Sequence, residues 1–302
     1  AELAKASGAT YELESRVESL LIKEGFVKGV IINRRGRTEE ASAGIVVDAE
    51  GTSSRLLRQL GLQTLNPHNL VNGVQVEVEN ARNLESDMVE VFLGSEYAPG
   101  FYAWVIPKGD GNAKIGLATK TGNPKELLQK FMLKHPVASG KLRKARILRT
   151  AFHPVSLGGP IPQAYSNGFL AVGDVASQVK PTTGGGVILG MTCAEIAAQV
   201  CVESLRSHDF SAGFLSLYQR RCKQALGFDM NVMLRARRML DSMSDDKIDE
   251  LIRSCTALGL DKALLNVKDI DFQGKSLLHI LRSPRTLAFL GYLFFLYLTA
   301  NP

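Results

Sequence analysis

The sequence has few of the residues that build metal centres or disulfide frameworks. Its four cysteines form no C-x-x-C pair, and its five histidines complete neither a zinc-ligand spacing nor an H-E-x-x-H element. We therefore expect no metal site. The cysteines should be free thiols buried in helices, as in a protein of a reducing compartment, the cytoplasm. The 36 basic and 30 acidic residues leave a formal charge of +6 that is spread along the chain, which argues against a nucleic-acid partner.

The sequence also lacks a signal peptide and a long hydrophobic run. The longest apolar stretch, LAFLGYLFFLYLTA at about 287–300, is shorter than the roughly 20 residues that a transmembrane helix needs. It fits an interfacial segment as well as a core helix. Together with the basic run at 141–149, it leaves a peripheral contact with the inner face of a membrane open, although a solvated strand face is the default for that run.

The first half of the chain has the pattern of β-strands. Residues 12–50 predict a β-meander in which VKGVIIN and AGIVVDA are strands joined by the polar turn RRGRTEE, and a helix follows from Ser53 or Ser54 to Gly61. Residues 70–120 alternate apolar and polar side chains, which predicts four antiparallel strands with one face on a core and the other free for a ligand. A helix at about 123–135 and a strand with a proline break, KARILRTAFHPVSL, come next.

The second half begins with a buried strand, FLAVGD, and the loop SQVKPTTGGG, and a long apolar helix follows. The remainder, about 211–302, has helical periodicity with breaks near Gly227, Gly259 and Gly274.

A strand-end carboxylate followed by a glycine loop and a helix is typical of a cofactor site. Asp174 ends the strand FLAVGD, where α/β sheets expose ligand-binding groups, and can accept hydrogen bonds from sugar-like hydroxyls. The loop at 184–186 lets backbone N–H groups approach a ligand at the positive end of the next helix. It is not a nicotinamide fingerprint, because about ten residues separate the strand from the glycines, and no P-loop Lys-Ser/Thr follows them.

Two segments carry a resemblance to a known family. GIVVDAEGTSSRLLRQLG resembles the middle motif of flavin-dependent oxidoreductases with the aromatic-hydroxylase fold, and GFLAVGDVASQVKPTTGGG resembles their third motif. Within that superfamily the chain most resembles the geranylgeranyl reductase family, whose substrate-side pattern is Tyr-x-Trp-x-Phe-Pro, then seven or eight residues, then Gly-x-Gly. Here the pattern is Tyr102, Trp104, Ile106 and Pro107, then Gly116-Leu117-Ala118.

The resemblance implies FAD as the cofactor and assigns residues to it. Asp174, with Gly173 before it, would contact the flavin ribityl chain, and Val17 would contact the adenine side. Gly185, Gly186 and Val187 would place backbone amides near the flavin ring. Tyr102 and Trp104 would lie on the substrate sheet, and Pro107 would shape its turn.

Some residues differ from the family pattern. Ile106 and Ala118 depart from it in the pocket region, and Glu50 stands where the middle motif usually has Asp. No side chain in either motif is in an obvious position to donate a proton, so no catalytic residue is assigned.

The expected fold class is α/β (α+β): a doubly wound FAD-binding domain with an antiparallel-sheet substrate domain and a helical C-terminal region. Residues 1–65 would be the remainder of the FAD-binding domain, 66–160 the substrate domain, 161–210 the return to the FAD-binding domain and 211–302 the helical region. The family's first motif, G-x-G-x-x-G in an opening βαβ unit, is absent. We therefore expect a longer protein of which Ala1 is a cut edge.

The resemblance implies a reductase that saturates C=C bonds of geranylgeranyl chains in lipids or lipid precursors. Its partners would be an isoprenoid lipid and an electron donor, either a ferredoxin, NAD(P)H or a quinol. Other flavoproteins of the fold stay open as alternatives, namely a monooxygenase, a halogenase or a quinone-linked dehydrogenase. A further alternative is a non-catalytic fragment that binds lipid.

Overall fold

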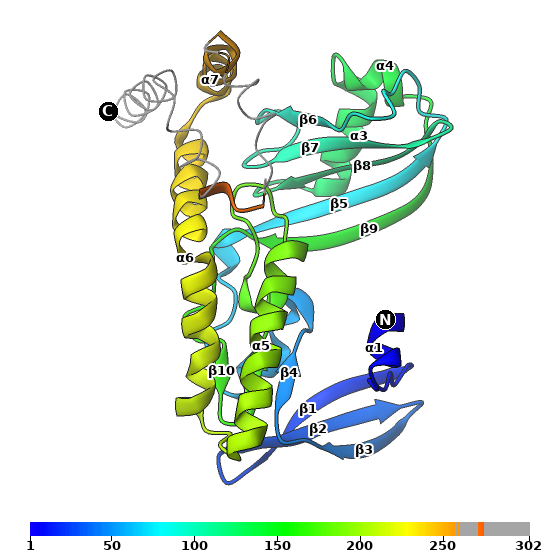
Figure 1. Cartoon of the computed structure of the whole chain (residues 1–302). Coiled ribbons are helices and arrows are strands. Elements are labelled where there is room, and N and C mark those ends of the chain that lie inside the picture. The colour runs from blue at the N-terminus through cyan, green and yellow to red at the C-terminus, as the bar shows by residue number, and fades with distance from the viewer. Residues whose placement is uncertain (258, 260–270, 275–302) are drawn as a thin grey trace. The chain divides into compact units, whose positions relative to one another are not determined.

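The computed structural model describes residues 1–257, 259 and 271–274, and it divides the chain into two compact units (Figure 1). Unit 1 is formed by residues 1–64, 160–178 and 190–225. Unit 2 is formed by residues 65–159, 179–189 and those from 226 onward. The mixed α/β class expected from the sequence is confirmed.

Unit 1 contains two small sheets. In the first, the strands are antiparallel in the order β1-β2-β3; in the second, β11 lies between β10 and β4 and pairs with β4 in parallel. Its elements before residue 178 are α1 (Glu2–Ala6), β1 (Ser15–Lys23), β2 (Phe26–Arg34), β3 (Arg37–Ser42), β4 (Val46–Asp48), α2 (Arg55–Gln59), β10 (Tyr165–Ser166) and β11 (Phe169–Ala171).

The polar turn predicted between two apolar strands is wrong in its extent. Only Arg35 and Gly36 turn the chain, and both have positive φ, as a two-residue hairpin turn requires. Arg34 therefore pairs with Arg37, and the polar residues that follow become β3, an edge strand. A polar, exposed edge strand carries no apolar alternation by which a sequence pattern could reveal it.

The helix predicted after β4 forms, but Ser54 does not cap it with its side chain. Ser54 has a left-handed backbone (φ 52°) and makes no capping hydrogen bond. Instead, the backbone N–H of Leu56 donates to the carboxylate of Glu50 at 2.8 Å. A carboxylate at this end of a helix also complements the helix dipole.

Unit 2 is built on a five-stranded antiparallel sheet of strand order β6-β7-β8-β5-β9. The four strands predicted from residues 70–120 are therefore confirmed. The fifth strand passes through Pro154 without a break, because an edge strand tolerates a proline that cannot donate to the ladder. The strands are β5 (Leu70–Glu79), β6 (Glu90–Leu93), β7 (Tyr102–Gly109), β8 (Asn112–Thr119) and β9 (Arg146–Ser156).

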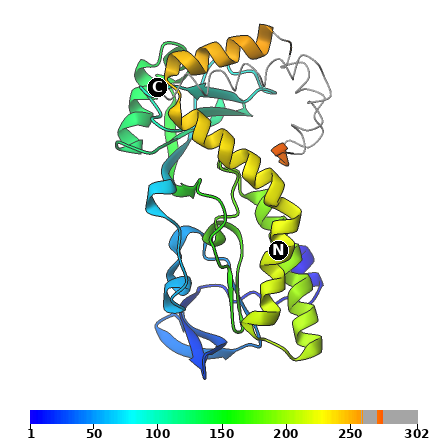
Figure 2. The same cartoon turned by 90° about the vertical axis from the view of Figure 1, so that its left-hand side faces the viewer.

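One face of this sheet is buried by α3 (Pro124–Lys134) and α4 (Ala138–Leu142), as Figures 1 and 2 show. The core there joins alternate residues of the strands, such as Val76, Ile115 and Leu117, to Leu128 and Phe131 of α3. Alternation along each strand leaves the intervening residues on the other face. That second face carries the candidate site.

Three longer helices complete the described part of the chain: α5 (Val187–Ser207), α6 (Ala212–Ser242) and α7 (Asp245–Ala257). α5 and α6 each contribute residues to both units. The predicted break near Gly227 is wrong, since α6 continues through it. Gly259 follows α7 with φ 68°, whereas the apolar run at 287–300 lies outside the described residues.

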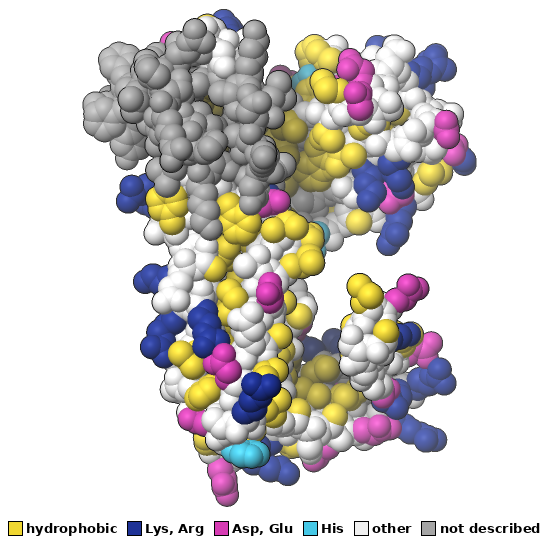
Figure 3. All heavy atoms as spheres, viewed as in Figure 1, with side chains coloured by type: hydrophobic (Ala, Val, Ile, Leu, Met, Phe, Trp, Pro, Cys, Tyr) yellow, Lys and Arg dark blue, Asp and Glu magenta, His cyan; other side chains and the backbone are white. Residues whose placement is uncertain are grey.

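α5 has an unusually apolar exposed side. By length and composition alone it could cross a membrane, a test that core helices of other proteins also pass, and 28% of its most apolar window is buried. Figure 3 shows hydrophobic side chains gathered along this helix. The exposed ones include Val187, Met191, Val202 and Leu205.

Candidate functional site

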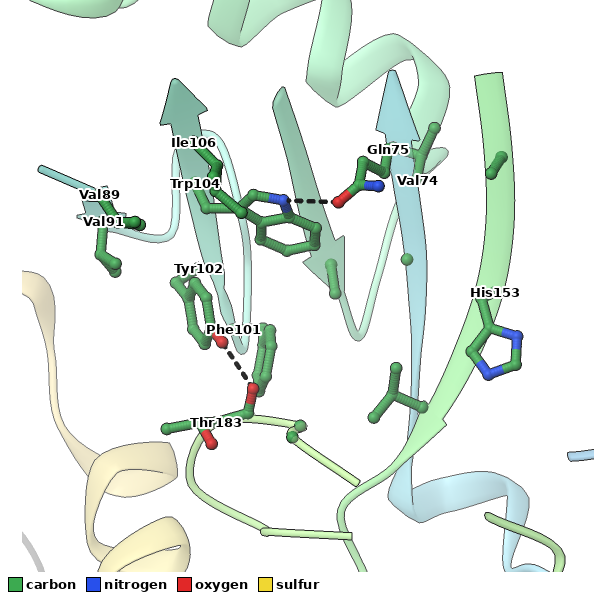
Figure 4. Close-up of a pocket in the computed structure, with 16 residues that line it drawn as sticks. Val74, Gln75, Val89, Val91, Phe101, Tyr102, Trp104, Ile106, His153 and Thr183 are labelled. Carbon is green, nitrogen blue, oxygen red and sulfur yellow. Dashed lines mark hydrogen bonds between the residues drawn. The ribbon is translucent and has the colours of Figure 1, made fainter. Parts of the chain in front are cut away.

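A pocket of about 480 Å³ lies on the open face of the unit 2 sheet (Figure 4). This volume is in the range of small-molecule sites. Its lining is mainly apolar, and the polar members are Gln75, Tyr102, His153 and Thr183. The other lining residues are Gly73, Val74, Val89, Val91, Phe101, Trp104, Ile106, Ala118, Ala151, Val155, Gly184 and Gly185.

Trp104 forms the flat wall of this pocket because a glycine faces it. Trp104 pairs with Gly116 across the β7–β8 ladder. A Cβ on Gly116 would lie 2.4 Å from Cζ2 of Trp104 and 2.7 Å from the carbonyl oxygen of Val74. The indole Nε1–H donates to Oε1 of Gln75 at 3.2 Å. The indole ring therefore occupies the space left by the missing side chain of Gly116, and its hydrogen bond to Gln75 fixes its orientation.

Tyr102 connects the sheet to the glycine loop. Its hydroxyl donates to the carbonyl of Thr183 at 2.6 Å. Its ring stacks on Phe101 with centroids 4.3 Å apart and meets Trp104 edge-on at 5.8 Å. Burial raises the pKa of Tyr102, so the phenol stays protonated and keeps this donor.

The glycine loop itself is tight and closely packed. Gly184 N–H donates to the carbonyl of Lys180 at 2.8 Å, and Lys180 N–H donates to the carbonyl of Gly185 at 3.0 Å. Gly184 has φ 71°, and a Cβ there would lie 3.2 Å from Val155 and 3.3 Å from Phe101. A side chain at this position would therefore be strained and crowded.

In unit 1, a buried network fixes the turn that carries Asp174. Gly173 N–H donates to Gln178 Oε1 at 2.7 Å, and the amide of Gln178 donates to the hydroxyl of Tyr218 at 2.6 Å. That hydroxyl donates in turn to the carbonyl of Ala171 at 3.0 Å. Burial raises the pKa of Tyr218, which keeps the phenol neutral. The half-buried Asp174 follows β11 by three residues, in a short 3₁₀-helix, Gly173–Ala176.

A second carboxyl group in unit 1 is buried at the end of β4. Asp48 is 2% exposed, and its Oδ1 accepts from the backbone N–H of Glu50 at 2.9 Å. Its Oδ2 is buried without a hydrogen-bond partner among the residues described. Burial raises the pKa of Asp48 from 3.8 to about 6.

The residues expected at the site divide between the two units. Val17, Gly173 and Asp174 belong to unit 1, where the carbonyl of Val17 accepts a hydrogen bond from Arg55. Tyr102, Trp104 and Gly185 line the pocket of unit 2. The remaining three are also in unit 2 but outside the lining: Gly186 and Val187 at the start of α5, and Pro107 beside a bulge that precedes the β7–β8 turn.

Sequence patterns missed several residues that shape these sites. Gln75 and His153 come from β5 and β9, and Tyr218 comes from α6. Alternation along β5 puts Gln75 on the open face, a signal that was available. Tyr218 lies 40 residues from Gln178, and no local pattern connects the two. Among the residues described, no group of three or more His, Cys, Asp or Glu is placed to hold a metal ion.

Comparison with known proteins agrees with this geometry. Residues 70–152, which span the sheet and its two helices, match the family model for the geranylgeranyl reductase catalytic domain. A digeranylgeranylglycerophospholipid reductase of Methanosarcina mazei is 31% identical over 292 residues, covering 94% of this chain and 67% of that protein. The chain belongs to the geranylgeranyl reductase family. The resemblance noted in the sequence is thereby confirmed.

A second member of the geranylgeranyl reductase family shows the same relation. Digeranylgeranylglycerophospholipid reductase 2 of Methanothermobacter thermautotrophicus is 34% identical over 257 residues, which are 83% of this chain and 64% of that protein. The chain thus spans about two thirds of the length of these relatives.

Solved structures of the fold extend the comparison. A geranylgeranyl bacteriochlorophyll reductase-like protein from Thermoplasma acidophilum aligns with a TM-score of 0.81 at 25% identity, covering 97% of this chain and 72% of that one. The flavin-dependent brominase Bmp2, in a triple mutant, aligns at 0.65 with 15% identity, over 96% of this chain and 72% of that one. The brominase is evidence for the fold alone. The fold expected from the sequence motifs is confirmed.

Proposed function

We propose that the protein is an FAD-dependent reductase that saturates C=C bonds of geranylgeranyl chains in phospholipids or their precursors. The observation that carries the proposal is the apolar pocket between the Tyr102–Trp104 wall and the loop at 183–185. This pocket joins the family's substrate pattern to its third flavin motif in one unit of a geranylgeranyl reductase. The named activity of the relatives supports the lipid class.

Two backbone features support a flavin. Gly184 has a positive φ and close contacts with Val155 and Phe101, which disfavour a side chain in the loop, and a Cβ on Gly173 would meet nothing within 4 Å. Asp174 would bind the ribityl hydroxyls, Val17 would contact the adenine side, and the amides of Gly185, Gly186 and Val187 would lie near the ring. When bound and reduced, the flavin supplies a hydride to one carbon of the double bond, and the second carbon takes a proton.

The chain's own residues would orient the isoprenoid and exclude water. Apolar surface for the isoprenoid chain is provided by Val91, Trp104 and Ile106. Each Å² of apolar isoprenoid surface that they remove from water stabilises the complex by about 25 cal/mol. Tyr102 holds the glycine loop against the pocket through its hydrogen bond to Thr183. Electrons would come from a ferredoxin, NAD(P)H or a quinol.

The pocket mouth also suits a protein that takes its substrate from a membrane. Val89 and Val91 line the pocket and are 59% and 56% exposed, and Met88 beside them is 55% exposed. Exposed apolar side chains in one patch mark interaction surfaces. A cytoplasmic protein in peripheral contact with the inner membrane face would use them. Flotation with vesicles should recover the wild type and lose a Met88→Ser, Val89→Ser variant.

The function is tested by product mass. FAD-loaded, chemically reduced protein incubated with a digeranylgeranylglycerophospholipid should yield lipid heavier by two mass units for each bond saturated. Trp104→Leu should slow the reaction, while Leu133→Ala, at an exposed position on α3, should not. Unchanged lipid under several electron donors, or an oxygenated product, would count against the reductase.

A further inference from the structure

The floor of the pocket consists of residues that pair across the sheet. Cross-strand partners point to the same face of a sheet. One row of partners runs from β6 to β9: Val91, Trp104, Gly116, Gln75 and Ala151. All of these except Gly116 line the pocket, and Gly73 and His153 pair in the next row toward the glycine loop. The mainly apolar floor of the pocket therefore runs along these rows of cross-strand partners.

The next row in the opposite direction is charged. Ile106 pairs with Lys114, Lys114 with Glu77, and Glu77 with Arg149. Two residues beyond Ile106 along β7, Lys108 donates to the carboxylate of Glu77 at 3.2 Å. We call Lys108, Lys114, Arg149 and Glu77 the basic rim. Three cations and one carboxylate give it a formal charge of +2, since 3 − 1 = 2.

The charges of the basic rim act on one another. The pKa of Glu77 lies below its usual value, first because of the hydrogen bond from Lys108 and then because of the charges of Lys108, Lys114 and Arg149. Glu77 is therefore ionised at neutral pH and neutralises one of the three cations. The excess of two positive charges stands at the end of a mainly apolar floor.

The basic run at 141–149 contributes only in part. Lys141 is paired with Glu90 at 2.5 Å and Arg146 with Glu79 at 2.6 Å. Arg149 instead lies in the row that continues the pocket floor. The cations that meet there come from three different strands, so no contiguous stretch of sequence reveals them.

We propose that the basic rim binds the phosphate of the lipid whose isoprenoid chain lies on the apolar floor. This inference rests on the proposed function and adds the position of the polar end. Lys and Arg make charge-assisted hydrogen bonds to phosphate oxygens. From Tyr102 to Lys108 is six residues of β7, about 20 Å. Figure 4 shows Tyr102, Trp104 and Ile106 following one another along β7, with Tyr102 beside the loop at Thr183. An isoprenoid chain laid along this strand would reach the glycine loop while its phosphate stays at the rim.

The test uses Trp104, the single tryptophan of the chain, as a binding reporter. Flavin-free protein is titrated with digeranylgeranylglyceryl phosphate and with neutral digeranylgeranylglycerol while indole emission is followed. The rim variant carries Lys108→Gln, Lys114→Gln and Arg149→Gln. A matched control removes the same charge elsewhere, through Lys23→Gln on β1 and Lys125→Gln and Lys134→Gln on α3.

The expected result is selective for the phosphate. The rim variant should bind the phosphorylated lipid at least about tenfold more weakly than wild type, and the control within about twofold. All three proteins should bind the neutral lipid alike. The difference should shrink as salt rises, because the rim is partly exposed. Lys114→Gln alone should give part of the effect.

Other results would overturn the inference in distinguishable ways. If the rim variant bound the phosphorylated lipid as tightly as the wild type does, the basic rim would not be the phosphate site. Inorganic phosphate that displaces this lipid as effectively as excess lipid does would assign the rim to free phosphate. A neutral lipid that leaves Trp104 emission unchanged in every protein would instead contradict the proposed function itself.

Discussion

Replacing Gly116 with alanine tests the geometry of the site most sharply. The added methyl would lie 2.4 Å and 2.5 Å from two atoms of the Trp104 ring and 2.7 Å from the backbone oxygen of Val74. Moving the indole alone does not relieve the contact with the backbone. We therefore expect Trp104 to be displaced and the β5–β8 pairing to be strained.

The magnitude follows from the contacts. Overpacking of this kind costs about 1–3 kcal/mol. Displacement of Trp104 also forfeits its hydrogen bond to Gln75, about 0.5–1.5 kcal/mol. The sum, roughly 1.5–4.5 kcal/mol, corresponds to a fall in melting temperature of roughly 3–18 °C, at about 2–4 °C per kcal/mol for a unit of this size.

The assay combines thermal unfolding with tryptophan emission, and its control is Gly140→Ala. Gly140 lies inside α4, and a Cβ there meets nothing within 4 Å. Helix propensity predicts that this change stabilises the protein by about 0.5–1 kcal/mol. If Gly116→Ala melted like the wild type with an unaltered emission spectrum, the packing described around Trp104 would be wrong.

Three other predictions concern single side chains. Because burial raises the pKa of Asp48 from 3.8 to about 6, the folded state retains a proton that the unfolded chain loses. The free energy of unfolding should therefore fall by about 1–3 kcal/mol as the pH rises from about 4 to about 6. Asp48→Asn should abolish that slope in urea unfolding; a slope that persists contradicts the assignment. Tyr102→Phe removes the hydrogen bond to Thr183, worth about 0.5–1.5 kcal/mol, so amide hydrogen exchange at 180–186 should accelerate. Unchanged exchange would contradict the idea that this hydrogen bond holds the loop. Asp174→Ala should weaken FAD binding by at least about tenfold in a fluorescence titration, whereas Asp209→Ala should leave it unchanged. Equal effects of the two substitutions would contradict a contact between Asp174 and the ribityl chain.

The sequence predicted those elements whose residues carry a clear period. Val74, Val76 and Val78 alternate with polar neighbours and mark β5 as half-buried. β3 escaped prediction because Arg37–Ser42 is polar and lies at an edge. The continuity of α6 through Gly227 also escaped, because a glycine costs a helix only about 1 kcal/mol, which the packing of a long helix outweighs.

The candidate site was predictable where one motif carries it and not where distant strands meet. Tyr102, Trp104 and Gly185 follow from the family pattern and line one pocket. The partner of Trp104, Gln75, lies 29 residues away and is set by strand register. The basic rim depends on the same register, because its cations come from three strands.

The most direct test of the central claim is an anaerobic single turnover. Reduced FAD bound to the protein is mixed with digeranylgeranylglycerophospholipid, and flavin oxidation is followed by absorbance while the lipid is analysed by mass. We expect one double bond to be saturated for each flavin oxidised. Flavin that stays reduced in the presence of lipid, and is oxidised only when oxygen is admitted, would contradict it.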